Sequence, residues 1–254
     1  MSTTKHYSNQ LPEAVFRNCS ANIYSWSSIL EFMGEPLFER GAIHFFRHGE
    51  TYLNRKGLNS GQQDCPLTAR GRMAAVKLAD EIPRNFSMVF SSPLSRSIET
   101  MELAFDRAPM KPKVVMLDSR LAEKSLGVLE SKPHVFIPEY DLGDVDYAPK
   151  NGETYRALAQ RCLSFLLDLR RILGANKLVS DPVVVVFTHM GPLRVFGSCF
   201  GRADTAKEMM ARKFGNLHGF VNELSDFRIP AFWADKDRNE EKNLTRSRVS
   251  KVRA

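Results

Sequence analysis

The chain has 254 residues, of which 43% are hydrophobic and 26% charged. This balance is typical of a globular domain and excludes a collagen-like or wholly disordered chain, and the length is enough for one α/β domain with a full core. The formal net charge of +7 favours an anionic partner, and nucleic acid, an acidic membrane surface or a small phosphate ester would each fit that sign.

We expect a soluble, cytoplasmic protein. The first residues, MSTTKHYSNQLPE, lack the apolar core of a signal peptide. The densest apolar run, residues 183–187, is far too short to cross a bilayer. The cysteines are far apart and form no CxxC pair or His/Cys cluster with metal-ligand spacing, so we expect free thiols at Cys19, Cys65, Cys162 and Cys199.

The regular pattern of apolar residues begins at Ala42. Residues 1–40 are polar with scattered aromatic side chains and are interpreted as an N-terminal extension, in which 23–33 could form one helix; the aromatics are Tyr24, Trp26, Phe32 and Phe38. Residues 42–46 (AIHFF) form an apolar run of strand length.

Two further strands and two helices are predicted between residues 68 and 117. Thr68 is a candidate N-cap for a helix that ends before Pro83, and its apolar stripe would include Met73, Val76 and Leu78. Residues 88–90 form the next strand, followed by a helix through Phe105 with Pro93 in its first turn. A third strand covers 114–117. The irregular stretch from 118 to 151 is longer than most connections, which indicates a functional role.

The C-terminal half continues the alternation. Residues 154–173 are strongly helical, with a buried stripe of Leu158, Cys162, Phe165, Leu166 and Leu169. Residues 183–187 (VVVVF) are apolar at every position, as in a strand covered on both faces. A helix follows from about Pro192, and 220–224 is a candidate edge strand.

The domain is predicted to cover residues 41–230, and residues 231–254 to form a basic tail. From Lys236 to Arg253 the tail has too few large apolar groups to bury, so we expect it to be solvated. Nucleic-acid binding by this tail is the weaker alternative.

Strands that alternate with helices predict a three-layer α/β sandwich with a mostly parallel central sheet. In such sheets, ligands bind beyond the carboxyl ends of the strands. Arg47 and His48 follow the first strand, Arg96 lies beyond the second, and His189 follows VVVVF. Arginines match phosphate oxygens, and a histidine can carry a phosphoryl group covalently. These residues therefore indicate phosphoryl transfer with His48 as the nucleophile.

The sequence resembles the histidine phosphatase (phosphoglycerate mutase-like) superfamily, phosphatase branch. The resemblance spans about residues 42–225 and rests on segments in family order: Arg47-His48-Gly49-Glu50-Thr51 with Asn54; Gly61, Asp64, Pro66-Leu67-Thr68 and Gly71; Ser91-Ser92-Pro93-Leu94 with Arg96; Leu121, Glu123, Gly127 and Glu130; Gly152-Glu153-Thr154; and His189, Gly191 and Arg194.

The resemblance implies a role for each matching residue. His48 would be the phosphorylated nucleophile, and Glu123 would donate a proton to the leaving oxygen and then activate water. The phosphate pocket would be lined by Arg47, Arg96 and His189, with contacts from Asn54 and Met190. Neither a metal nor another cofactor is expected. Glu50 and Glu130 compete with Glu123 for the acid role, and Arg194 and Glu153 are either orienting groups or a surface ion pair.

Three lone histidines are expected to be structural or exposed: His44, His134 and His218.

Three functions are weighed: a phosphatase, a phosphomutase and an inactive phospho-ligand binding module. The cofactor-dependent mutases of the family carry an aromatic and basic segment after the acidic residue, whereas Glu123 is followed here by Lys124-Ser125-Leu126-Gly127, which favours a phosphatase. A binding module would have lost His48, Arg96 or His189. The sequence also departs from the family pattern, and these departures put in doubt any substrate copied from a relative. They are at Leu58, Ser60, Val128-Leu129 and Met190-Gly191-Pro192.

The expected partner is a small phosphate ester. Aromatic residues of the extension, with Phe136, Tyr140 and Tyr147 of the long loop, could form a wall over the phosphate and favour a nucleotide or flavin-type monophosphate. The alternative is that they only pack the extension onto the domain. No membrane or nucleic-acid partner is expected, and self-association is left open.

Overall fold

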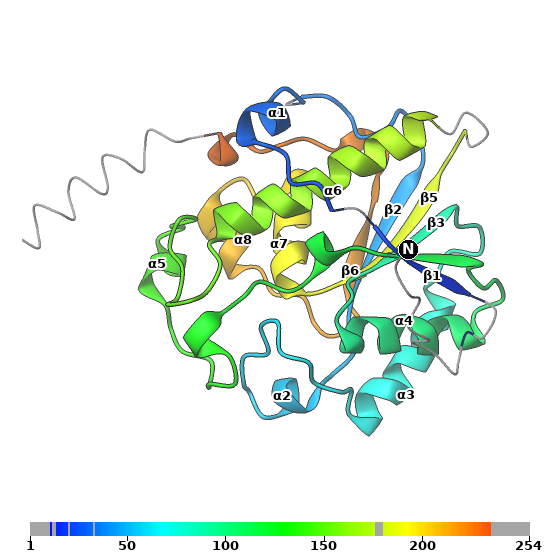
Figure 1. The fold of residues 1–254 in the computed structure, drawn as a ribbon, viewed down its shortest axis with the longest axis horizontal. Helices are drawn as coiled ribbons and strands as arrows, with labels where there is room; N and C mark the ends of the chain where they lie inside the picture. Colours follow the sequence, from blue (N-terminus) through cyan, green and yellow to red (C-terminus); the bar gives the residue numbers. More distant parts are fainter. Residues whose placement is uncertain (1–10, 12–13, 20, 33, 176–179, 235–254) are drawn as a thin grey trace, which may run out of the picture.

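The computed structural model describes residues 11, 14–19, 21–32, 34–175 and 180–234 (Figure 1). In this part of the chain six strands form one sheet in the order β1-β4-β3-β5-β2-β6. Neighbouring strands are parallel except for β6, which is antiparallel to β2. The mostly parallel sheet is thereby confirmed. The strands are β1 (Val15–Asn18), β2 (Ala42–Arg47), β3 (Met88–Ser91), β4 (Val114–Leu117), β5 (Val183–Thr188) and β6 (Gly219–Glu223).

Helices cover both faces of the sheet and make the predicted three layers. Figure 1 shows α3 (Ala69–Lys77) and α4 (Ser95–Arg107) on one side, and α6 (Tyr155–Ala175) and α7 (Met190–Cys199) on the other. The remaining helices are short: α1 (Trp26–Leu30), α2 (Tyr52–Arg55), α5 (Pro138–Asp141) and α8 (Ala206–Ala211). None of the described helices combines the length and hydropathy that crossing a membrane requires.

Strand β5 shows why an apolar run is placed at the centre. Val184 and Val186 lie in the core beneath α6 and α7, whereas Val185 and Phe187 lie in the core against α4. Successive side chains of a strand point to opposite faces, so a strand covered on both faces needs apolar residues at every position. The interpretation of VVVVF as a central strand is confirmed.

The prediction that regular structure begins at Ala42 is wrong. Residues Val15–Asn18 form β1, which pairs in parallel with β4 at the edge of the sheet. The segment is short, and Val15, Arg17 and Asn18 are exposed, so it lacks the apolar run by which a strand is recognised. The helix expected over 23–33 is limited to α1, where Ser25 caps the first turn; Met33 lies outside the described residues.

Several predicted boundaries also change. Thr68 caps α3 as expected, but Met73 is 65% exposed and therefore lies off the buried stripe. Pro93 precedes the N-cap Leu94 and is not in the first turn of α4. Helix α7 begins at Met190, directly after His189.

The domain extends beyond residue 230. Ala231–Trp233 form a short 3-10 helix, and Trp233 is 1% exposed and stacks on Trp26. The boundary predicted at 231 is therefore too early, because this ring is part of the core. The basic segment from Lys236 lies outside the described residues.

Candidate active site

Two histidines follow the carboxyl ends of two neighbouring strands. In the register of β2 and β5, Arg47 is opposite Thr188, so that His48 and His189 are the first residues beyond two adjacent parallel strands. The His48 backbone N–H donates to the Thr188 carbonyl at 3.1 Å. The two rings are buried, with centroids 5.0 Å apart. The structure thus brings together both histidines that the sequence singled out.

The ring of His48 is fixed in one orientation and one tautomer. Its Nδ1 lies 2.8 Å from the Gly49 carbonyl oxygen. Because a carbonyl only accepts, Nδ1 carries the proton and Nε2 keeps its lone pair. Burial lowers the pKa of His48 well below its ordinary value, and the charges of Arg47 and Arg96 lower it further. The ring is therefore neutral at neutral pH and can act as a nucleophile.

In the described part of the chain, the hydrogen bonds of two guanidinium groups beside His48 go to neutral oxygen atoms. Arg47 Nη1 donates to the Phe214 carbonyl at 2.6 Å. Arg96, which is fully buried in α4, donates to the carbonyls of Gly61 and Gln63, both at 2.7 Å. Neither has an ion-pair partner among the described residues. Their positive charges are left for an anion.

Three buried nitrogen atoms around this point have no hydrogen-bond partner in the described part of the chain: Nε of Arg47, Nε of Arg96 and Nδ1 of His189. The other ring nitrogen of His189 is 2.7 Å from Ser92 Oγ. Burial, then Arg96 and His48, lower the pKa of His189 well below its ordinary value. Buried polar atoms normally have a partner, so these atoms indicate a place for an oxygen-rich ligand such as phosphate.

Among the three candidate acids, Glu123 is the one whose position best suits proton transfer. It lines the same cavity as His48, and its Oε1 accepts from the backbone N–H groups of Lys124 at 2.7 Å and Gly191 at 2.9 Å. Glu50 and Glu130, the two competitors, are not among the described residues that line this cavity. Glu50 accepts from the Thr68 hydroxyl, and Glu130 accepts from the backbone of residues 62 and 126.

Gly191 lets the start of α7 approach Glu123. A Cβ at this position would lie inside 3.0 Å of Glu123 Oε1 and 3.2 Å from Leu158 Cδ2 and Lys124 Cβ. A side chain at 191 would therefore push the carboxyl group away, so Gly191 positions Glu123. The resemblance included this glycine, and its steric role became visible only in the structure.

Asn54 and Met190, two of the residues that the sequence singled out, lie in the cavity wall. The Oδ1 of Asn54 accepts from the Thr51 backbone at 3.3 Å and from Asn216 Nδ2 at 3.1 Å, so the Asn54 amide N–H groups are left to donate to a ligand. Asn216 also donates to the carbonyls of His48 and Gly49. No pattern in the sequence points to Asn216, because it lies in a loop and belongs to no motif.

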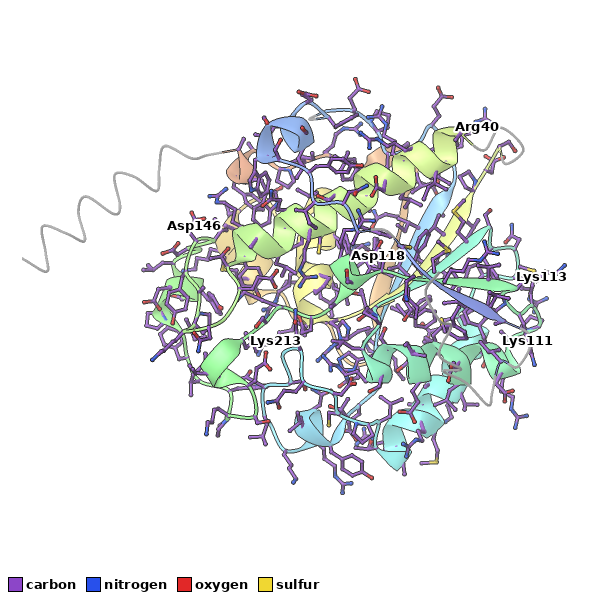
Figure 2. The ribbon with its side chains drawn as sticks, viewed as in Figure 1. Arg40, Lys111, Lys113, Asp118, Asp146 and Lys213 are labelled. Carbon is purple, nitrogen blue, oxygen red and sulfur yellow. The ribbon has the colours of Figure 1, made fainter. Side chains whose placement is uncertain are left out.

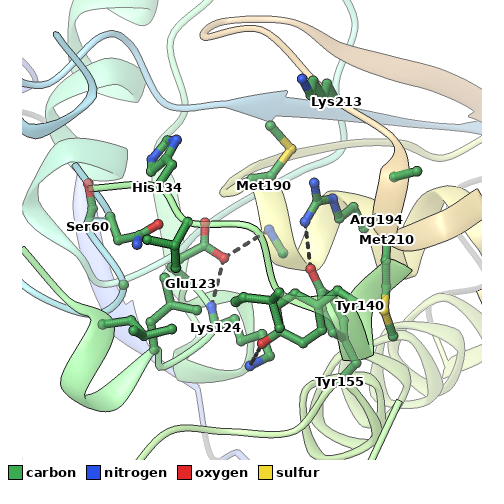
Figure 3. Close-up of a pocket in the computed structure, with 18 of the residues that line it drawn as sticks. Ser60, Glu123, Lys124, His134, Tyr140, Tyr155, Met190, Arg194, Met210 and Lys213 are labelled. Carbon is green, nitrogen blue, oxygen red and sulfur yellow. Dashed lines mark hydrogen bonds between the residues drawn. The ribbon is translucent and has the colours of Figure 1, made fainter. Parts of the chain in front are cut away.

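The cavity has a volume of about 690 Å³, several times that of a phosphate group (Figure 3). One part of its wall is apolar, with Leu126, Leu129, Val135, Phe136, Ile137 and Met210. Another part is basic, with Lys124, Arg194, Lys207 and Lys213. The wall therefore extends well beyond the phosphate group and can contact the rest of a substrate.

Of the aromatic residues expected to form a wall, two of the three in the long loop line the cavity, and the four in the extension are not among its lining residues. Phe136 and Tyr140 line it, and Tyr147 packs on the Tyr140 ring. In the extension, the Tyr24 hydroxyl donates to Asp168 on α6 at 2.5 Å, and Trp26 stacks on Trp233. The alternative, that the extension packs onto the domain, is confirmed for these two residues.

Lys124, which follows Glu123 in the sequence, also lines the cavity. It is 3% exposed, and its ammonium donates to the Tyr140 hydroxyl at 3.0 Å and to the Glu153 carbonyl. The rings of Tyr140 and Tyr155 lie within 5.5 Å of Nζ. Burial lowers the pKa of Lys124 to about 8. A lysine in a loop is ordinarily exposed, so no pattern in the sequence predicted this burial.

Arg194 and Glu153 do not form an ion pair with each other in the structure. Glu153 pairs with Arg161 at 2.8 Å, whereas Arg194 donates to the Tyr155 hydroxyl and the Arg212 carbonyl. Among the lone histidines, His134 is exposed at the cavity wall, His218 is exposed, and His44 is half-buried in β2. All four cysteines are free thiols, as expected.

Comparisons with known proteins agree with this geometry. The family described as histidine phosphatase superfamily (branch 1) matches residues 43–218. The probable phosphoglycerate mutase GpmB of Escherichia coli is 30% identical over 137 residues, which are 50% of this chain and 62% of that protein. The chain thus spans less than two thirds of the length of these curated relatives.

Two solved structures share the fold. A mycobacterial glucosyl-3-phosphoglycerate phosphatase, solved with VO3, has a TM-score of 0.62 and 24% identity, and the match covers 74% of this chain and 95% of that one. A structure described as mycobacterial hydrolase 1 has a TM-score of 0.59 and 24% identity, with 72% and 90% covered. At this identity they show the fold alone.

Proposed function

The chain belongs to the histidine phosphatase superfamily, and we propose that it is a phosphomonoesterase that hydrolyses a small phosphate ester through a phosphohistidine at His48. The proteins that it resembles include a phosphatase and a probable phosphomutase. The observation that carries this proposal is the state of His48. Its Nδ1 is bound to the Gly49 carbonyl, and the guanidinium groups of Arg47 and Arg96 beside it have no carboxylate partner among the described residues.

In the first step, the Nε2 lone pair of His48 attacks phosphorus, and the bond from phosphorus to the leaving oxygen breaks. Arg47, Arg96 and His189 donate hydrogen bonds to the phosphoryl oxygens, where negative charge is concentrated. The protonated carboxyl of Glu123 gives its proton to the leaving oxygen. The alcohol leaves, and His48 carries the phosphoryl group.

In the second step, water takes the phosphoryl group. The Glu123 carboxylate accepts a proton from water while the water oxygen attacks phosphorus, and the P–N bond to His48 breaks. Inorganic phosphate leaves, and both His48 and Glu123 return to their starting states. The Nδ1–H bond to Gly49 holds the ring in place throughout.

The phosphatase is preferred to a phosphomutase because Glu123 is followed by Lys124-Ser125-Leu126 and not by the aromatic and basic segment of the cofactor-dependent mutases. The two are distinguished by the acceptor. In a phosphatase, water accepts the phosphoryl group and inorganic phosphate is the product. In a mutase, a hydroxyl group of the alcohol accepts the phosphoryl group, and a new phosphate ester is the product.

The proposal is tested by trapping the phosphoenzyme. Wild-type protein mixed with ³²P-labelled phenyl phosphate and quenched within a turnover should carry an acid-labile, base-stable label, and His48→Ala should carry none. His218→Ala, an exposed histidine outside the cavity wall, is the matched control and should label normally. Normal turnover by folded His48→Ala would contradict the proposal.

We propose that this reaction takes place in the cytoplasm, where free cysteines stay reduced.

We also propose that the reaction needs no metal. Activity should survive exhaustive treatment with EDTA, and restoration of lost activity by a divalent metal would contradict metal independence. The aromatic side chains of Phe136 and Tyr140 in the cavity wall support a substrate with an aromatic leaving group, such as a nucleotide or flavin-type monophosphate. A panel of phosphate esters would test this preference.

A further inference from the structure

The N-terminal extension is bonded into the domain although it lies outside the match to the family, which begins at residue 43. Figure 1 shows residues 21–32, in blue, passing across α6. The Tyr24 backbone N–H donates to Ser164 Oγ at 3.0 Å, and the Tyr24 carbonyl accepts from Gln160 Nε2 at 2.8 Å. Both partners are on α6, so these two bonds fix the position of Tyr24 on that helix.

From this position the extension reaches a buried arginine. The Tyr24 hydroxyl donates to Asp168 Oδ1 at 2.5 Å, and the other oxygen of this carboxylate accepts from Arg120 Nη1, also at 2.5 Å. The same Nη1 donates to the Asn22 carbonyl at 3.0 Å. The hydrogen bond to Asp168 raises the pKa of Tyr24, so the phenol keeps the proton that it donates. The extension therefore contacts Arg120 directly through Asn22 and indirectly through Asp168.

The side chain of Arg120 is held in one orientation. It is 3% exposed, and its Nη2 donates to Asp118 Oδ2 at 2.7 Å. Asp118, near the centre of the molecule in Figure 2, also accepts from the Arg120 backbone N–H at 2.9 Å. Removing one partner of a buried ion pair leaves an uncompensated charge. A change in the partners of Arg120 should therefore move its side chain and the backbone that carries it.

Arg120 begins a short segment that ends in Glu123, and every backbone carbonyl of this segment accepts a hydrogen bond from a side chain. Arg161 on α6 donates to the carbonyls of residues 120, 122 and 123 at 2.6, 2.7 and 3.0 Å. Thr188, the residue before His189, donates to the carbonyl of residue 121 at 2.7 Å. The segment is thereby held as one unit, so a shift at Arg120 is transmitted to Glu123.

Glu123 needs a defined position because it transfers a proton in both steps of the proposed reaction. Its carboxyl group is oriented by the backbone N–H groups of Lys124 and Gly191, and these bonds depend on where the backbone of Glu123 lies. A displacement of about 1 Å in a catalytic group can lower its rate by ~100-fold. A smaller shift that begins at Arg120 should have a smaller effect of the same kind.

We propose that the N-terminal extension is part of the catalytic apparatus, and that Tyr24 is a positioning residue for Glu123 that acts through Asp168 and Arg120. The proposal rests on the proposed function, in which Glu123 is the acid and the base. Tyr24 is not among the described residues that line the cavity. Loss of its hydroxyl should therefore slow the steps that need proton transfer and leave the attack of His48 on phosphorus unchanged.

The test is Tyr24→Phe, which removes the hydroxyl and keeps a ring beside the Arg171 guanidinium, 4.7 Å from the ring centroid. With benzyl phosphate, whose alcohol needs a proton to leave, kcat should fall about fivefold, the effect of one hydrogen bond. With 4-nitrophenyl phosphate, whose leaving group needs no proton, the single-turnover rate of His48 phosphorylation should keep its wild-type value. The phosphoenzyme should then persist about five times longer, since its hydrolysis needs Glu123.

A second variant and a control separate positioning from simple packing. Asp168→Asn removes a charge that holds Arg120 and should show the same pattern, and the double variant with Tyr24→Phe should lose less than the product of the two effects, because both act along one path. The matched control is Glu35→Gln, which breaks a 2.9 Å ion pair between the extension and Arg170 on α6 without involving Arg120. It should keep wild-type rates with both esters.

Wild-type kinetics of Tyr24→Phe with both esters would overturn the proposal, even if its melting temperature falls. An equal slowing of His48 phosphorylation by 4-nitrophenyl phosphate and of benzyl phosphate turnover would also overturn it, because the effect would then not pass through Glu123. In either case, labelling of His48 in the wild-type protein would leave the proposed function intact. If wild-type protein forms no phosphoenzyme from 4-nitrophenyl phosphate, the proposed function itself fails.

Discussion

Replacing Gly191 with alanine tests how tightly Glu123 must be positioned. The added methyl group would lie inside 3.0 Å of Glu123 Oε1, whereas ordinary van der Waals contact begins at 3.4 Å. Leu158 Cδ2 and Lys124 Cβ, both 3.2 Å from the methyl, restrict movement in other directions. The carboxyl group must therefore retreat by roughly 0.5–1 Å and weaken its bond to the 191 N–H. A displacement of about 1 Å can lower kcat by ~100-fold, which corresponds to about 2.7 kcal/mol.

The assay uses two leaving groups. For an alkyl phosphate, whose alcohol needs a proton to leave, kcat of Gly191→Ala should fall by about 10- to 100-fold. For 4-nitrophenyl phosphate, whose leaving group needs no proton, His48 should still be phosphorylated quickly. Hydrolysis of the phosphoenzyme should then become slow, since water activation also depends on Glu123. Rapid quenching should therefore show the phosphoenzyme accumulating.

The matched control is Gly174→Ala near the end of α6, where an added Cβ would have no neighbour within 4 Å. It should keep wild-type kinetics and gain up to about 1 kcal/mol of stability, because alanine favours a helix more than glycine does. Wild-type kcat of Gly191→Ala on the alkyl ester would refute the argument that this glycine positions Glu123.

Two further predictions concern pH. Because the folded pKa values of His48 and His189 are lowered from 6.5, the unfolded chain binds more protons below that pH, so the free energy of unfolding should fall as pH drops through 6.5. In ¹⁵N spectra both rings should stay neutral at pH 6, and protonation of either near 6.5 would contradict this. Lys124 has a folded pKa of about 8 against 10.5, so urea unfolding should show wild type gaining stability relative to Lys124→Met between pH 8 and 10.5. A constant difference would show that burial does not lower this pKa.

The sequence predicted best those features that a local pattern determines. Residues 183–187 of strand β5 are apolar at each position because both faces are covered, and the histidines of the site follow directly from strands β2 and β5. Thr68 caps α3 because its hydroxyl satisfies a free backbone N–H. These arrangements depend on a few neighbouring residues, so they can be recognised without the rest of the chain.

Features that depend on distant partners could not be predicted in this way. Strand β1 is stabilised by its pairing with β4, nearly a hundred residues later, and its own sequence is short and half polar. The burial of Lys124 depends on the Tyr140 hydroxyl and the Glu153 carbonyl, which accept hydrogen bonds from its ammonium group. Met73 seemed to belong to the apolar stripe by spacing alone, yet it is exposed.

The pairing of β2 has a consequence for the synthesis of the protein. Among the described strands, the partners of β2 are β5 and β6, so the segment that ends in Arg47 emerges from the ribosome well before these neighbours exist. At about 5–20 residues per second, the ribosome takes roughly 7–30 s to reach Thr188. Until then, His48 has neither His189 beside it nor the neighbouring strand that orients it. The enzyme should therefore gain activity in a single late event, and a nascent chain that ends before β5 should be inactive however well its first half folds.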